Sequence, residues 1–234
     1  MSSVDAAHLC ASLATLHACS TAMSWLQSAT PSTYQVTLEE LYAAARPDWI
    51  AWLGARLEIR TRFDTTFAMV SLCVLHLHPL WKSLEPDDTV VADALTYAMS
   101  DKADPRSEKY ASLVERLRDM RDSYCTADEI VHRQIVDCVR RTLCLHDQAL
   151  NTELYANRVD IIVDDVLCIL RNNAGDYTSA KDAAQDAVVA TVRRTYTFQS
   201  LKTALYAYAE QAQFGADVEF SFRWHQAGAA VRTA

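Results

Sequence analysis

Glycine and proline are scarce in this sequence. Its 234 residues include only four glycines and five prolines, where average usage would supply roughly sixteen and twelve. Most β architectures need frequent turns, and Gly and Pro make many of them, so this scarcity favours long helices. Half of the residues are hydrophobic, which suffices for a large core. The sequence therefore predicts an all-α protein, a multi-helix bundle of about nine or ten helices.

Paired cysteines and long apolar runs are also missing. The seven cysteines are scattered without a CxxC pair, which favours reduced thiols buried as small apolar residues. The amino terminus, Met1-Ser2-Ser3-Val4-Asp5, lacks the basic start of a signal peptide. No run of about eighteen apolar residues occurs anywhere. We therefore expect a cytoplasmic protein without a membrane partner.

Basic residues are outnumbered. The chain has 22 Lys and Arg against 30 Asp and Glu, a net charge of −8. Such a field repels phosphate backbones and so disfavours nucleic acid as a partner. Two small arginine groups exist, but acids are interleaved with both, as on a solvated helix face; they are Arg116, Arg118 and Arg121, and Arg140 and Arg141. The net charge suits a basic protein surface instead.

Several familiar catalytic motifs are absent. The sequence has no GxGxxG, no Walker phosphate loop, no GxSxG and no HExxH. Four glycines leave little material for a backbone cradle around phosphate. No cysteine has a histidine at a spacing typical of a thiol nucleophile. We therefore expect a non-enzymatic protein that holds no cofactor.

Apolar residues recur every three or four positions along most of the chain, as on helices with one buried side. Thr37 and Thr126 are each followed by Glu three residues later, as in capping boxes. A break is expected near 195–197, and the last segment, 218–231, suits a strand as well as a helix. The expected helical segments are 5–29, a short one after Thr37, one from Pro47, 61–78, 87–100, a stripe over 110–120, one from Thr126, 151–172 and 178–214.

A polar stretch at 101–106 is the best boundary within the chain. Composition changes little across it, which indicates one domain with two lobes rather than two domains. We expect an N-terminal helical lobe over 1–100, carrying a tryptophan motif, and a C-terminal helical lobe over 101–234.

The tryptophan motif carries a family resemblance. Its residues are Ala18-Cys19, Ala22, Trp25, Thr37, Asp48-Trp49-Ile50-Ala51-Trp52-Leu53, Arg56 and Leu57. Over 18–104 this pattern resembles a helical family of phage and bacterial immunity proteins. The family usually has Arg-Gly-Asp where this chain has Arg46-Pro47-Asp48. Two Trp residues three apart share one side of a helix, so the motif itself predicts packing more than chemistry.

The resemblance implies a protein that works by binding another protein inside a bacterial host cell. A phage-encoded inhibitor that blocks a basic nuclease or another defence effector is the leading hypothesis. Its acidic side chains would then contact the target's basic surface. The expected contact residues form two groups: Glu39, Glu40 and Asp48 near the motif, and Asp160, Asp164 and Asp165. Trp25, Trp49, Trp52 and Arg56 are expected to be structural.

Two alternatives remain open. One is a metal-dependent phosphohydrolase of the HD type, with His146, Asp147 and Asp164 as ligands and His132 nearby. His132 and His146 would lie about 21 Å apart on an unbroken helix, too far to share one ion. Helix-end histidines are thus the favoured interpretation. The other alternative is a structural subunit that forms homo-oligomers through exposed helix faces.

Overall fold

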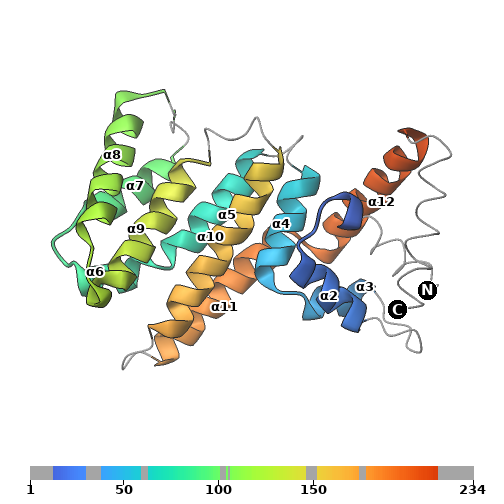
Figure 1. The fold of residues 1–234 in the computed structure, drawn as a ribbon, viewed down its shortest axis with the longest axis horizontal. Coiled ribbons are helices and arrows are strands. Elements are labelled where there is room, and N and C mark those ends of the chain that lie inside the picture. The colour runs from blue at the N-terminus through green and yellow to red at the C-terminus, as the bar shows by residue number, and fades with distance from the viewer. Residues whose placement is uncertain are drawn as a thin grey trace. The chain divides into compact units, whose positions relative to one another are not determined.

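A computed structural model describes residues 13–29, 38–58, 63–100, 104, 106–145, 152–173 and 178–215. Within these ranges the chain forms eleven α-helices and one short 3-10 helix, and no strand (Figure 1). The all-α prediction is therefore confirmed. The Thr37 capping box and the uncertain segment at 218–231 lie outside the described residues.

The helices follow the predicted pattern in type and, for most of them, in position. Their bounds are α2 Ser20–Ala29, α3 Leu38–Ala44, α4 Pro47–Glu58, α5 Phe63–Leu75, α6 His78–Leu84, α7 Val90–Ala98, α8 Glu108–Ser123, η1 Ala127–Glu129, α9 Ile130–Leu143, α10 Thr152–Asn172, α11 Thr178–Thr195 and α12 Phe198–Gly215. Pro47 begins α4, where its missing amide hydrogen costs nothing. The expected break near 195–197 is present, because α11 ends at Thr195 and α12 begins at Phe198.

Two expected helices are interrupted. The first is broken by a turn at His17, whose φ of 62° lies in the left-handed region, so that α2 begins only at Ser20. The second ends at Leu75 rather than His78, and His78 and Pro79 start α6. Pro79 thus lies in a first helical turn, where proline is tolerated, and does not end a helix.

The chain forms two compact units, and their division differs from the expected lobes. One unit is Met1–Arg46 with Thr197–Ala234, and the other is Pro47–Tyr196. The expected boundary at 100 and 101 falls inside the second unit. There α7, before that boundary, packs against α8 and α9, which follow it. Contacts between helices, and not the polarity of the joining stretch, therefore decide the division.

The first unit contains α2, α3 and α12. Leu26 of α2, Leu41 of α3 and Leu201 of α12 are all buried. The rings of Tyr42 and Phe198 join α3 to α12, with centroids 5.8 Å apart.

The second unit is organised around α10, its longest helix. This helix packs against α4, α5, α9 and α11, and Figure 1 shows it with α9 to one side and α4 to the other. Its inward side is fully buried and aliphatic or aromatic, including Tyr155, Val159, Ile162, Val166 and Ile169. The predicted apolar stripe at helical spacing is therefore the core of this unit.

A close approach at Gly54 fixes how three helices of this unit meet. A Cβ atom at Gly54 would lie 2.4 Å from the ring of Tyr196, so only glycine fits beneath that ring. The Tyr196 hydroxyl is hydrogen-bonded to the Thr66 hydroxyl on α5, and both side chains are buried. Gly54 therefore serves packing between α4 and the residue that follows α11, and not a turn.

The most apolar stretch lies in α5 and α6. Thr65–Leu84 is long and apolar enough, by length and composition, to cross a membrane, and 44% of its most apolar window is buried inside the protein. Core helices of globular proteins meet the same criteria. Val70, Cys73 and Val74 of α5 are completely buried.

Candidate protein-binding surface

The tryptophan motif on α4 is part of the core. Trp52 is buried, and its indole Nε1 donates a hydrogen bond to Asn157 Oδ1 on α10 at 3.0 Å. Asp48, in the first turn of the same helix, is only 3% exposed. The motif therefore attaches α4 to α10, as its predicted structural role requires.

The remaining motif residues divide between the two units. Trp25 lies half-buried on α2 in the first unit, whereas Trp49 and Arg56 lie half-buried on α4 in the second. Burial also corrects the expectation that Asp48 contacts a partner, since a buried carboxylate offers little surface to bind. Glu39 and Glu40, in the first turn of α3, are exposed as that expectation requires.

The outward side of α10 exposes two large apolar residues. Leu154 is 52% exposed and Ile161 is 45% exposed. They lie seven residues apart, two turns of helix, and so occupy the same side. Cys168, seven residues further on, is half-buried. We call these three residues the outward stripe.

Polar side chains border the outward stripe on both flanks. At about 100° per residue, Asn157 and Asp165 lie about 40° to opposite sides of Ile161. Asn157 accepts the Trp52 hydrogen bond from α4, and Asp165 accepts one from Arg141 of α9 at 2.7 Å. The stripe therefore runs along a helix that is held on both flanks and at its back.

The three acids expected to bind a partner on α10 differ in their surroundings. Asp160 and Asp164 are half-buried on the outer half of the helix, and Asp164 Oδ1 lies 3.9 Å from Cys168 Sγ. Asp165 pairs with Arg141 of α9, so the charge that was expected to meet a basic partner is balanced within the protein. Distance in sequence hid this pair, because Arg141 and Asp165 are on different helices.

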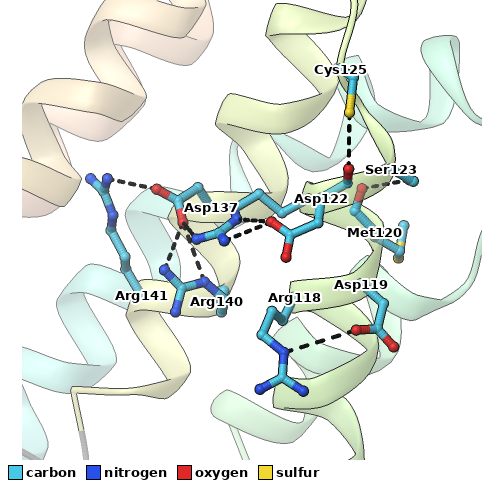
Figure 2. Close-up of polar contacts among 10 residues, drawn as sticks. Arg118, Asp119, Met120, Asp122, Ser123, Cys125, Asp137, Arg140 and Arg141 are labelled. Atoms are coloured by element: carbon cyan, nitrogen blue, oxygen red, sulfur yellow. Dashed lines mark hydrogen bonds and ion pairs between the residues drawn. The ribbon is translucent and has the colours of Figure 1, made fainter.

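An ion-pair network continues from Asp165 through Arg141 to α9 and α8, and Figure 2 shows the part of it around Asp137 and Asp122. Its centre is Asp137, which lies within 4 Å of three arginines: Arg140 at 2.8 Å, Arg141 at 2.6 Å and Arg121 at 3.8 Å. Arg121 also pairs with Asp122 at 2.6 Å. The network thus comprises Arg121, Asp122, Asp137, Arg140, Arg141 and Asp165. Three positive and three negative charges balance, so it joins α8, α9 and α10 without giving this surface a net charge.

Burial shifts the pKa values of two groups, Asp165 within this network and Cys138 beside it. Desolvation raises the pKa of the Asp165 carboxyl, although the Arg141 guanidinium opposes that rise. Desolvation also raises the pKa of the fully buried Cys138 thiol, so this cysteine stays protonated and inert. These shifts are those of a structural junction and provide no reactive nucleophile.

A second polar cluster, which the sequence did not indicate, lies where α6 meets the start of α9. The rings of Trp81, Tyr124 and His132 lie edge to face or tilted, with centroids 5.0 to 6.3 Å apart. Glu85 Oε1 accepts from the Tyr124 hydroxyl at 3.3 Å and lies 3.6 Å from His132 Nε2. Burial raises the pKa of Tyr124 to about 12, and the negative charge of Glu85 is the second largest cause of this rise. Sequence could not group these side chains, since Glu85 and Tyr124 alone are 39 positions apart.

His132 therefore has partners other than those of an HD-type metal site. It lies in the first turn of α9, which continues unbroken to Leu143. His146 and Asp147 lie outside the described residues. Across the described ranges, no three His, Cys, Asp or Glu side chains are grouped so as to hold a metal ion.

Comparisons with known proteins found no relative of this chain. No protein-family description, no curated protein and no solved structure matches the chain.

Proposed function

We propose that this protein works by binding another protein through the outward stripe of α10, as a non-enzymatic inhibitor or immunity-type factor. The observation that carries the proposal is the exposure of Leu154 and Ile161 on a helix whose opposite side is completely buried. Apolar side chains on a rigid helix are typical anchors for a partner. Such a helix loses little conformational freedom on binding.

The acids supply the second element of the proposal. Asp164 borders the stripe, Asp160 lies further round α10 on the same side, and Glu39 and Glu40 are exposed on α3. With a net charge of −8, the protein would attract a basic target at long range. A basic nuclease or defence effector of a bacterial host is the target class that suits this charge and the resemblance to immunity proteins.

The test is affinity capture from bacterial host lysate with three forms of the protein, read by quantitative mass spectrometry. The double variant Leu154→Glu/Ile161→Glu changes the stripe, and Leu72→Glu is its matched control. Leu72 is 44% exposed on α5 and belongs to the same unit. We expect wild type and control to recover the same basic protein and the double variant to lose it. Equal recovery by all three forms would refute the stripe as the binding surface.

The contribution of charge is tested separately. Reversal of Asp160 and Asp164 to lysine should weaken capture and reduce its dependence on salt, because screened long-range attraction would be lost. Reversal of Glu39 and Glu40 to lysine tests whether the acids of the first unit contribute to capture in the same way. If neither reversal changes recovery, the target does not recognise the acids.

A further inference from the structure

The residues that flank the outward stripe are complementary to the same residues of a second, antiparallel copy of α10. Consider an antiparallel copy of α10 related by a two-fold axis beside Ile161. Residues at equal sequence distance on either side of Ile161 then face each other, and each flank meets the same flank of the other copy. Leu154 is thereby placed against Cys168 of the second copy, and Ile161 against Ile161.

The flank on the α9 side brings opposite charges together. Arg158 and Asp165 lie on this side of Ile161, about 60° and 40° from it. In the antiparallel pair they come within about one residue, or 1.5 Å, of the same level. Arg158 of each copy would therefore face Asp165 of the other. Asp165 already accepts from Arg141 through Oδ2, and a carboxylate can accept from two arginines.

The flank on the α4 side pairs a donor with an acceptor. Asn157 and Asp164 lie on this side and also come within about one residue of the same level. Asn157 Oδ1 is occupied by the Trp52 indole, which leaves the amide NH2 to donate outward. It would face the carboxylate of Asp164 from the second copy. An acidic partner would suit only the donor on each flank, and a basic partner would suit only the acid on each flank.

We infer that the outward stripe binds a second copy of this chain, forming an antiparallel α10–α10 dimer centred on Ile161. The contact involves little more than one helix per chain, so it belongs to the small, weak class of interfaces. We expect dissociation constants in the micromolar range. This inference goes beyond the proposed function and holds whether or not a target exists; a target at the same stripe would compete with the second copy.

The test is sedimentation velocity of the full chain across a concentration series, using a charge exchange. Arg158→Glu places an acid opposite Asp165 of the second copy, and Asp165→Arg places a base opposite Arg158. Each variant alone should dimerise at least about tenfold more weakly than wild type, since the repulsion occurs twice per dimer.

A mixture of the two variants should restore association. One contact of the mixed dimer pairs the introduced glutamate with the introduced arginine, and the other pairs the native Arg158 with the native Asp165. Both contacts then join opposite charges, so a heterodimer should form. Thermal unfolding followed by circular dichroism confirms that each variant is folded.

Ile161→Glu provides a further variant that no mixture should rescue, and Leu72→Glu should dimerise like wild type. A wild-type chain that remains monomeric at several hundred micromolar would overturn the inference. So would dimers that form equally in Ile161→Glu, or single variants that show no recovery on mixing while remaining folded. Equal target capture by wild type and the stripe variant, with dimerisation behaving as expected, would instead count against the proposed function alone.

Discussion

The two sides of α10 carry similar apolar residues, but only the inward side is buried in the core. Ile161 and Ile162 are neighbours in sequence and identical in chemistry, yet Ile161 is 45% exposed and Ile162 is completely buried. Ile162 belongs to the stripe that holds α4, α5, α9 and α11 together. The fold requires the inward residue and leaves the outward one unconstrained. Any reason for an apolar residue at position 161 therefore has to be sought outside the folded chain.

Substitution of the two isoleucines gives the largest expected contrast. Ile162→Ala should lower the free energy of unfolding by about 2–5 kcal/mol, because it removes buried methyl groups and leaves a cavity. Ile161→Ala should change it by less than about 0.5 kcal/mol. Urea unfolding at low protein concentration, where self-association is negligible, measures both. Equal losses would mean that the outward side is also core.

Substitution of Gly54 tests the core packing by adding a methyl group, whereas the Ile162 variant removes buried atoms. Gly54→Ala should destabilise the protein by about 1–3 kcal/mol, since the new methyl would overlap the Tyr196 ring, despite the better helix propensity of alanine. Chemical denaturation with an unchanged m-value is the measurement. A stabilised variant would show that the ring moves aside at no cost.

Asp137 is intermediate between the buried Ile162 and the exposed Ile161, because its side chain is 19% exposed. Asp137→Asn keeps the shape but leaves three arginines without their shared carboxylate, and should cost about 1–2 kcal/mol. The loss should shrink in high salt, which screens the remaining repulsion between the arginines. Denaturation at low and high ionic strength distinguishes this from a packing defect, whose cost would not depend on salt in this way.

Glu129 should show the smallest effect, and its sign follows from pH. Its carboxylate accepts from the Thr126 backbone N–H at 3.1 Å and from the Thr126 hydroxyl at 2.8 Å, and these bonds lower the pKa of Glu129. A lowered folded-state pKa stabilises the protein above the ordinary value of 4.5, and that contribution disappears as pH falls through the folded value. Wild type and Glu129→Gln should therefore differ most above pH 4.5 and converge in acid. Thermal midpoints measured from neutral pH into the acid range provide the comparison.

The sequence predicted the features that depend on local pattern. The inward stripe of α10, the start of α4 at Pro47, the Glu129 half of the second capping box and the break after Thr195 all follow from spacing or from residue type. The turn at His17 was missed, because no glycine or proline marks it. The helix expected over 61–78 was ended before Pro79, although proline is equally suited to a helix start.

The candidate surface was predictable only in part. Sequence grouped Asp160, Asp164 and Asp165 as expected contact residues on one helix, but it could not show that Arg141 from α9 pairs with Asp165. Asp48 was expected on the surface because it is charged, and packing of α4 buries it. The exposure of Leu154 was equally hidden, because apolar residues at helical spacing are expected to lie in the core. Tertiary contacts decided each of these cases, and periodicity alone does not report them.

The most direct test of a binding role for the outward stripe follows Ile161 and Ile162 together by methyl NMR. Purified partner from the capture experiment would be added to protein labelled at the isoleucine δ1 methyl groups. The account predicts that the Ile161 signal shifts or broadens with partner concentration, while the Ile162 signal keeps its position. An unchanged Ile161 signal at saturating partner, with shifts confined to other methyl groups, would contradict it.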